Sequence, residues 1–479
     1  MQADVAYKGS APIRGRFTAF YTNLDSDGQY AIPTNPYANG VESQISTLSG
    51  SYNTSLSPYP SYTHTRQYGS TLNLQADYDG GTITSITGYS HLTNNWGEDF
   101  SGGVPSSALG IPSDEYLALY IRDSKSTQHQ ISQELQAAGH AFGGFLDYVG
   151  GLYYFSESAT QDVDQSIFLA PSTQGFNVDT DSYAAFGQLT ANLTDKLSLI
   201  AGGRYTVDYK HLSAYFDNTA IQRDDAFARF SPKTGITYKF TPDIQAYFTY
   251  SEGFKAGGYN GLAGTAEQIN TPFKPEVTSA KEVGVKTELF ENHVRVNVSL
   301  FQNDVHNIQQ LFNLDDGTFL VDNFDARIRG AEIEASWRVT HELTVWGNAS
   351  FNDGTYTSGG GTTTVDTTGK KVVGLPDQQF NVGADYAVAL GAGTFSFGGD
   401  ALFRSQTYST IDNGAIGKVP DQSFVNAYVG YEQGPWVYHV GVKNLLNASG
   451  YVTGFGFSVV QPRFPLDPRS VLATVRYKF

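Results

Sequence analysis

Apolar and polar residues alternate along many short stretches of this chain. In residues 197–209, Leu199, Tyr205 and Tyr209 fall on one side of an extended segment, and Ser198 and Arg204 fall on the other. Residues 244–251, 293–300 and 394–404 repeat the alternation. Successive side chains of a strand point to opposite faces, so this period of two predicts β-strands with one apolar face and excludes helices there.

The last ten residues carry the same pattern to the end of the chain. Val471, Ala473, Val475, Tyr477 and Phe479 share one side, and mostly polar residues occupy the other. In an outer-membrane β-barrel the apolar side contacts lipid and the polar side lines an aqueous lumen. A half-buried strand of a soluble sandwich shows the same alternation, so one strand does not decide between the two.

Short and long connections alternate between the predicted strands. The pattern predicts tight turns at residues 79–81, 139–140, 194–196, 241–243, 291–292, 340–341, 391–393 and 433–435. It predicts long loops near residues 25–66, 94–126, 158–180, 211–225, 253–277, 304–325, 353–377, 405–420 and 447–469. Short turns on one rim and long loops on the other are typical of bacterial outer-membrane barrels, and a sandwich has no reason for them. We therefore predict an all-β fold, a transmembrane antiparallel up-and-down β-barrel of about 18 strands with both chain ends on the short-turn side.

Composition changes this picture little. The 479 residues include 51 Gly, 31 Tyr, 31 Phe and no Cys, and no linker divides them, so residues 1–479 are expected to form one domain. A mean hydropathy of -0.30 and the lack of a long apolar run exclude membrane helices, which need about 20 apolar residues. A net charge of -17 argues against a nucleic-acid partner. The first residues lack the features of a signal peptide, so we expect a fragment whose start lies upstream.

Several sequence phrases occur in a familiar order. They are YGSTLNL at 68–74, TSITGY at 84–89, ISQEL at 131–135, FLDYVGGLYY at 145–154, FSPKTG at 230–235, YSEGFKAGGYN at 250–260, KPE at 274–276, EVGVK at 282–286, RGAEIE at 329–334, VKNLLN at 442–447 and PR at 468–469. Together they make the chain resemble the barrel domain of TonB-dependent receptors. The resemblance implies that the complete barrel has about 22 strands and that a plug domain fills its lumen. The plug and the first strands are then expected to be missing from this chain. The strand near residues 14–21 is then expected to be an edge of the sheet.

The resemblance also implies a function. The expected activity is TonB-dependent uptake of an iron chelate such as a ferric siderophore, in the outer membrane of a Gram-negative bacterium, with no cofactor. Expected partners are the chelate, the TonB complex acting through a plug that is not in this chain, outer-membrane lipid and lipopolysaccharide, and the barrel-assembly machinery. Val475, Tyr477 and Phe479 would form the C-terminal signal for that machinery. Alternatives are a passive porin, a receptor for cobalamin or carbohydrate, and an adhesive barrel without transport.

Ligand-binding residues are expected among aromatic residues of the long loops, because a flat chelate can stack on them. The candidates are Trp96, Phe254, Tyr259, Phe312, Arg404, Tyr408 and Tyr451. Further residues that could line an external vestibule are Glu98, Asp99, Phe100, Phe319 and Phe455. The alternative for these side chains is packing within their own loops. Arginines predicted to face inward, and so able to attract an anionic chelate, are Arg204, Arg295, Arg338 and Arg404.

Other chemistry finds little support in the sequence. No Ser-His-Asp arrangement, phosphate-binding loop or zinc spacing is present, so we expect no enzyme activity. His306 with Asp304, Asp315 and Asp316 is the one local grouping that resembles a metal site, and a solvated polar loop is the preferred interpretation.

Overall fold

The structure, a computed structural model, describes residues 2–8, 13–28, 31–34, 56–113, 115–314, 318–360, 366–456 and 461–478. Nineteen strands form one antiparallel sheet in which each strand pairs with its neighbours in chain order. They are β1 (Gln2–Lys8), β2 (Ile13–Ser26), β4 (Tyr62–Tyr78), β5 (Gly81–Asp99), β8 (Tyr120–Ala141), β9 (Leu146–Ile167), β10 (Ala170–Asn192), β11 (Leu197–Phe216), β12 (Thr219–Thr241), β13 (Ile244–Lys255), β14 (Glu276–Leu289), β15 (Val294–Asn313), β16 (Phe319–Arg338), β17 (Leu343–Ser358), β18 (Gln378–Leu390), β19 (Gly393–Arg404), β22 (Gln422–Gln433), β23 (Trp436–Lys443) and β26 (Ser470–Tyr477). The all-β, up-and-down fold predicted from the sequence is confirmed.

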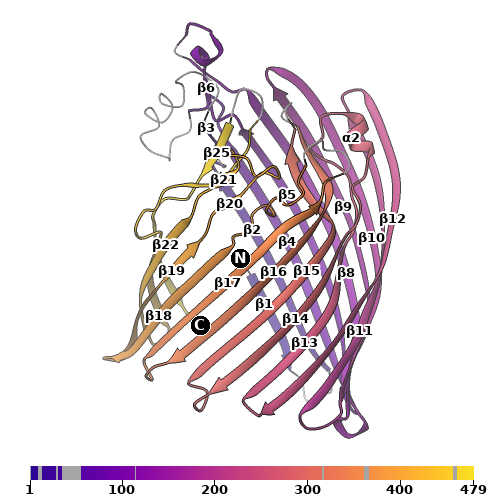
Figure 1. Ribbon diagram of the computed structural model, residues 1–479, viewed down its shortest axis with the longest axis vertical. Coiled ribbons are helices and arrows are strands. Elements are labelled where there is room, and N and C mark those ends of the chain that lie inside the picture. The colour runs from indigo at the N-terminus through magenta and orange to yellow at the C-terminus, as the bar shows by residue number, and fades with distance from the viewer. Residues whose placement is uncertain are drawn as a thin grey trace.

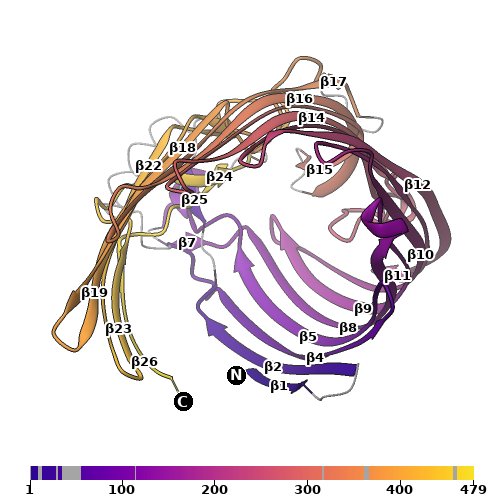
Figure 2. The same cartoon turned by 90° about the horizontal axis from the view of Figure 1, so that it is seen from below.

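The sheet is strongly curved. Its tilted strands wrap around a central lumen, and its two end strands, β1 and β26, approach each other (Figures 1 and 2). Among the described residues, β1 pairs only with β2 and β26 pairs only with β23. The prediction that the edge lies near residues 14–21 is wrong, because β2 is paired on both sides, with β1 and with β4. The additional strand β1 raises the count from about 18 to 19. β1 runs toward the short-turn rim, and its first residue, Gln2, is paired with Phe20 away from that rim. The prediction that both chain ends lie on the short-turn side is therefore wrong for the N-terminal end.

Smaller elements lie at the long-loop end (Figure 1). β3 (Ile32–Thr34), β24 (Tyr451–Gly454) and β25 (Gln461–Pro465) form a three-stranded sheet. β6 (Val104–Pro105) pairs with β7 (Tyr116–Leu117), and β20 (Thr407–Tyr408) pairs with β21 (Lys418–Val419). The helical elements η1 (Ser106–Leu109) and α2 (Ala266–Asn270) also belong to long loops, whereas η2 (Phe142–Gly144) joins β8 to β9 at the short-turn rim. In the described residues no helix has the length and apolar character that crossing a membrane would require.

The outward face of the sheet is apolar, as the alternation predicts. Exposed aliphatic side chains form a band around it, among them Leu74, Ile83, Leu135, Leu152, Leu199, Ile236, Val283, Leu300, Ile333 and Val382. Exposed aromatic residues border this band near the short turns: Tyr78, Phe142, Phe145, Phe240, Phe290, Trp337, Trp436 and Tyr477. Others border it on the opposite side: Tyr21, Tyr68, Tyr89, Tyr183 and Tyr209. An apolar band between two aromatic girdles is the surface that a membrane barrel presents to lipid.

The C-terminal strand follows the same rule. Tyr477 is paired with Trp436 across β23 and β26, and the two rings lie 4.9 Å apart. Val475 and Tyr477 are both exposed on this face. Phe479 lies outside the described residues.

Several predicted loops are strands in the structure. Residues 158–180 and 211–225 lie largely in β9, β10, β11 and β12, which turn at Phe168 and Leu169 and at Asp217 with φ of +49°, +66° and +48°. β15 and β16 likewise extend through most of residues 304–325. The outward face of these segments is polar because they rise beyond the membrane band into water, whereas their other face buries Leu212, Ile221 and Phe324 in a core formed by the long loops. Their backbone ladder continues there all the same, since antiparallel hydrogen bonding does not require an apolar side.

The short turns occur close to their predicted places. Gly80, Gly391 and Gly434 have positive φ and close three of them. One prediction is displaced: Gly139 and His140 lie within β8, and the chain reverses at η2 instead.

Candidate functional site

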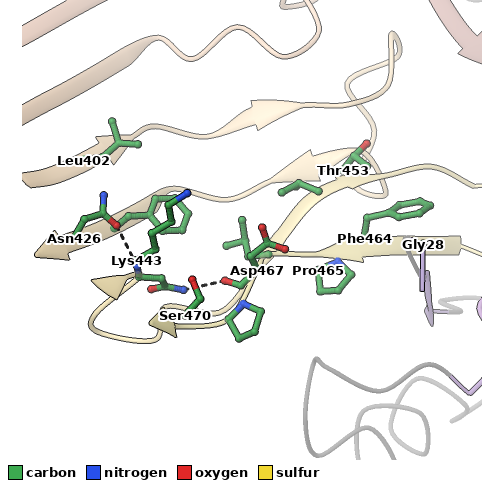
Figure 3. Close-up of a pocket in the computed structure, with 14 residues that line it drawn as sticks. Gly28, Leu402, Asn426, Lys443, Thr453, Phe464, Pro465, Asp467 and Ser470 are labelled. Carbon is green, nitrogen blue, oxygen red and sulfur yellow. Dashed lines mark hydrogen bonds between the residues drawn. The ribbon is translucent and has the colours of Figure 1, made fainter. Parts of the chain in front are cut away.

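A cavity of about 700 Å³ lies on the inner side of the sheet near its last strands. Figure 3 shows its wall, which combines strand residues with the segment that leads through β25 into β26. Its lining includes Leu402, Phe424, Asn426, Lys443, Asn444, Val452, Phe464, Asp467 and Ser470. We call it the vestibule cavity. It presents an apolar wall with one ammonium group, one carboxyl group and two side-chain amides.

Asparagines hold the polar part of the vestibule cavity in place. The Asn444 backbone N–H donates to Asn426 Oδ1 at 3.1 Å, and Asn426 Nδ2 donates to Asp400 Oδ2 at 3.0 Å. Asn444 Nδ2 donates to the carbonyls of Ala448 and Asp467 at 2.9 and 3.1 Å. These bonds tie the loop before β26 to the top of β23.

The phrase at residues 442–447 now has a physical reason. Asn444 and Asn447 have φ of +50° and +54°, a left-handed conformation that asparagine tolerates better than most residues. Asn447 Oδ1 then accepts the backbone N–H of Arg469 at 3.0 Å. The two phrases at 442–447 and 468–469 therefore form one structural unit that sets the start of the last strand.

Six aromatic side chains gather beside the vestibule cavity. This aromatic cluster consists of Trp96, Phe100, Tyr120, Phe319, Phe455 and Phe464. Phe100 lies 6.1 Å from Trp96, 5.2 Å from Tyr120 and 6.4 Å from Phe464, measured between ring centroids. Phe455 lies 5.2 Å from Phe319 and 5.9 Å from Phe464. Tyr120 and Phe464 are 0% and 7% exposed, so the cluster is a packed core, and Phe464 joins it to the lining of the vestibule cavity.

A buried polar layer supports this cluster. Arg122 is 2% exposed, and its Nε and Nη2 donate to Gln165 Oε1 at 3.2 and 2.5 Å. Its guanidinium also lies over the Tyr120 ring, 5.7 Å from the centroid. Glu98 is opposite Arg122 across β5 and β8, yet within the described part of the chain its Oε1 has no hydrogen-bond partner. This layer lies well above the apolar band, since Glu98 follows Tyr89 by nine residues of β5.

Glu98 is held in its neutral form. Burial raises the pKa of its carboxyl from 4.5 to about 8, and the neighbouring charge of Asp99 adds to the increase. Burial likewise lowers the pKa of the Arg122 guanidinium. The folded loop therefore keeps a proton on Glu98 that the unfolded loop releases at neutral pH, so loop stability falls as the pH rises from about 4.5 to about 8.

Replacing Glu98 by glutamine should remove this pH dependence. The natural loop should lose roughly 2 kcal/mol of stability between about pH 6 and pH 7.5, as Glu98 becomes charged. Glutamine has no carboxyl group to ionise, so the stability of the variant loop should not change over this range. Hydrogen exchange of residues 97–120, corrected for its intrinsic pH dependence, measures the effect. Glu115→Gln, an exposed change in the same loop, is the control and should keep the natural slope. If loop stability changed equally with pH in the natural protein and in both variants, Glu98 would not be the group responsible.

The predicted ligand residues fall in separate places. Trp96 belongs to the aromatic cluster. Arg404 donates to the side-chain oxygen of Gln422, whose Nε2 donates to the Tyr451 carbonyl at 2.7 Å, so Arg404 and Tyr451 lie close together. The Arg463 guanidinium lies 5.1 Å from the Tyr451 ring centroid.

The remaining candidates lie elsewhere. Phe312 is buried in the loop core against Phe324, with ring centroids 6.2 Å apart. The Tyr259 hydroxyl donates to Asp225 Oδ2 at 3.0 Å. Phe254 lines a second cavity of about 560 Å³ together with Arg204. The Tyr408 carbonyl accepts the backbone N–H of Gly374 at 2.8 Å. Ligand contact by these residues stays a prediction.

Sequence reasoning missed Tyr120, Arg122, Gln165 and Phe464. Tyr120 and Phe464 lie within predicted long loops, so the criterion that selected Trp96 could have included them. No sequence signal marks Gln165 as the partner of Arg122. In the described residues no group of three or more His, Asp or Glu side chains could hold a metal ion. His306 Nδ1 lies 3.7 Å from Asp325 Oδ1, Asp304 is bound to Arg327, and Asp315 and Asp316 lie outside the described residues.

The fold is a large antiparallel β-barrel whose long-loop end holds the vestibule cavity and the aromatic cluster. A family model described as TonB dependent receptor-like, beta-barrel, matches residues 4–445, and the chain belongs to this family. It is 29% identical over 238 residues to the ferrichrome outer membrane transporter/phage receptor of Escherichia coli K12, covering 46% of this chain and 29% of that protein. It is 24% identical over 318 residues to the pesticin receptor of Yersinia pestis, covering 63% of this chain and 46% of that protein. The chain thus spans less than half the length of these relatives.

Solved structures show the same fold. The ferric yersiniabactin uptake receptor of Yersinia pestis superposes with a TM-score of 0.80 at 17% identity, over 98% of this chain and 68% of that one. The siderophore receptor PiuA of Acinetobacter baumannii gives a TM-score of 0.75 at 15% identity, over 100% of this chain and 74% of that one.

Proposed function

We propose that this chain is the barrel of an outer-membrane receptor for TonB-dependent uptake of an iron chelate such as a ferric siderophore. The family match over residues 4–445 carries the proposal, together with relatives named for ferrichrome, ferric-pyoverdine and catecholate siderophores. The outward apolar band and its girdles support an outer-membrane location. The protein is a receptor rather than an enzyme in this proposal, and iron is its cargo.

The vestibule supports a chelate as the ligand. The partly exposed rings of the aromatic cluster, those of Trp96, Phe100, Phe319 and Phe455, would offer edges and faces on which a flat chelate can stack without desolvating charge. Lys443, Arg404 and Arg463 add cationic groups nearby, which suit the negative charge that many chelates carry. Ligands of other classes, such as cobalamin or carbohydrate, are the alternative substrates within this proposal.

Energy and assembly are part of the same proposal. Transport would draw on the TonB complex through a plug domain, and the barrel-assembly machinery would recognise the C-terminal residues Val475, Tyr477 and Phe479. Outer-membrane lipid and lipopolysaccharide would surround the band. A passive porin is the rival, because a porin needs neither plug nor coupling.

Uptake of radiolabelled iron chelates by cells tests the proposal. Cells that carry the natural protein should take up at least one chelate from a panel of hydroxamates, catecholates and mixed chelates, and an otherwise identical strain without TonB should not. If cells with and without TonB took up solutes of this size equally well, the protein would be a porin instead. Failure of every chelate, with TonB-dependent uptake of cobalamin or an oligosaccharide, would change the substrate class.

Within that assay, Phe464→Leu should weaken uptake. Leucine keeps apolar volume but removes the ring, so the chelate concentration for half-maximal uptake should rise roughly three- to tenfold. Phe145→Leu, an exposed change near the short turns, is the control and should leave uptake unchanged. An unchanged concentration for Phe464→Leu would remove the aromatic cluster from the ligand site.

A further inference from the structure

One panel of the outward surface is rich in basic side chains. It is formed by β4, β5 and β8, which are neighbours in the sheet (Figure 2). Its members are His64 and Arg66 from β4, His91 from β5, and Lys125 and His129 from β8. We call it the basic panel.

The strand register places these residues in three adjacent rows. His91 is opposite Tyr68 on one side and His129 on the other. The next row toward the long loops joins Arg66, Thr93 and Thr127. The third joins His64, Asn95 and Lys125. Five basic side chains therefore share a surface only three strands wide.

The basic panel faces outward and begins where the apolar band ends. Tyr68, Tyr89 and Ile131 are on the same strand faces and are exposed. Below them on these faces are Leu72, Leu74, Ile83 and Leu135. His91 follows Gly81, at the short-turn end of β5, by ten residues, which corresponds to about 25 Å of height for a strand tilted by about 40°. The panel is thus continuous with the lipid-facing surface and at the level of the outer headgroups.

The charges of the basic panel are not neutralised within it. From Tyr89 and Ile131 up to Lys125, the outward positions of these three strands contain no Asp or Glu. Arg66, Lys125 and His129 form no hydrogen bond or ion pair with any other described residue. This is unusual in a chain with a net charge of -17.

The carboxylates nearest to the basic panel lie on its borders. Asp25 of β2 accepts from His64 Nδ1 at 2.9 Å. Asp123, one row above Lys125, accepts from the hydroxyls of Tyr59 and Tyr62 at 2.5 and 2.9 Å. Asp162 lies on β9, beside Lys125 in the register. His91 stacks on Tyr68 with ring centroids 4.9 Å apart.

A second outward group of cations provides the contrast. Arg327 Nε is 2.6 Å from Asp304 Oδ1, Lys281 Nζ is 3.8 Å from Asp304 Oδ2, and Arg329 Nε donates to Gln302. There each cation is engaged by a protein group, whereas in the basic panel Arg66, Lys125 and His129 have no hydrogen bond or ion pair with another described residue.

We propose that the basic panel binds the phosphate groups of the phosphorylated glycolipid that forms the outer leaflet. The inference rests on the outer-membrane location proposed above. Arg66 suits phosphate through its planar donor fork, and Lys125 supplies a second point charge. Thr93, Thr127 and the imidazoles add hydrogen-bond donors between them. The acyl chains of the same molecule would contact Leu72, Leu74, Ile83 and Leu135 below, so one lipid would bind to both the basic panel and the apolar band.

Native mass spectrometry of the full-length protein in detergent tests this. The variant Arg66→Gln/Lys125→Gln should bind purified lipopolysaccharide about tenfold more weakly than the natural protein, since each basic residue near a charged membrane surface adds affinity. The control Lys196→Gln/Lys239→Gln makes the same charge change at the short-turn rim and should bind normally. Enzymatically dephosphorylated lipopolysaccharide should bind the natural protein as weakly as the double variant binds the intact form.

Three results would overturn the proposal. One is equal binding by the double variant and the natural protein. Another is equal binding of intact and dephosphorylated glycolipid. The third is displacement of the glycolipid by millimolar inorganic phosphate, which would indicate a site for the free ion. Membrane fractionation and chelate uptake keep the two proposals apart: outer-membrane location with lipid binding but no TonB-dependent uptake would refute the receptor function and leave the lipid site standing.

Discussion

Replacing Asp99 by alanine is expected to unfold the loop between β5 and β8 locally. The Asp99 side chain is 1% exposed and accepts four short hydrogen bonds: from Ser101 N–H at 3.0 Å, Ser101 Oγ at 2.5 Å, Gly103 N–H at 3.0 Å and Ser57 Oγ at 2.8 Å. Alanine leaves these buried donors without an acceptor, which costs about 3–5 kcal/mol of loop stability. The loop cannot adjust easily, because Gly103 has φ of +86° and a Cβ there would lie 2.3 Å from the Leu56 backbone.

Hydrogen exchange of residues 99–120 measures this effect. Protection of the loop should fall by more than a hundredfold in Asp99→Ala, while the strands of the membrane band keep theirs. Because Phe100 and Tyr120 flank the loop, chelate uptake should fall with it. Asp195→Ala, at an exposed short turn, is the control and should behave like the natural protein. Unchanged protection in Asp99→Ala would show that Asp99 does not organise the loop.

Replacing Ile333 by arginine is expected to destabilise the barrel by about 2–4 kcal/mol, because an arginine near the middle of a lipid-facing surface is costly. Ile333 is exposed on the outward face and is paired with Val298 and Ala349. Urea unfolding in lipid bilayers measures the loss. In detergent micelles, which adapt around a charge, the loss should be smaller.

A matched variant on the inner face separates lipid contact from mere strand damage. Asn348 neighbours Ala349 in β17 and is opposite Glu334 on the lumen side. Asn348→Arg adds the same charge beside that carboxylate, so its stability should stay within about 0.5 kcal/mol of the natural protein. If the two arginine variants lost equal stability, the assignment of the two faces would be wrong.

The predicted inward and outward faces agree with the structure where the apolar period is clean. Ile333 is exposed outward, and the flanking Glu334 accepts from Asn297 on the opposite face. The same agreement holds for Leu199, Tyr205 and Tyr209 in β11. Lipid imposes this pattern on every strand that crosses the band, so local sequence suffices to recognise it.

Prediction from sequence failed where that constraint ends. Residues 158–180 were expected to be a loop, yet most of them are paired in β9 and β10 above the band. The outward residues there are polar, and on the other face buried polar residues such as Gln165 and Gln174 interrupt the apolar Val163 and Phe176, so no clear period remains. The ladder that orders these segments depends on a partner strand. The edge of the sheet was misplaced for another reason: β1 has only seven residues, so its alternation of Val5 and Tyr7 with polar residues is too short to mark a strand, and its pairing with β2 identifies it.

The sequence by itself determined the membrane-barrel fold, the direction each band residue faces and the resemblance to a receptor family, because these properties repeat along the chain at a period of two. Only the tertiary structure decided the site. Trp96, Phe319 and Phe464 are far apart in sequence, and their meeting in the aromatic cluster depends on how loops from different strands fold over the lumen. The basic panel likewise depends on strand register, since a shift of one residue would turn His91 and His129 toward the lumen.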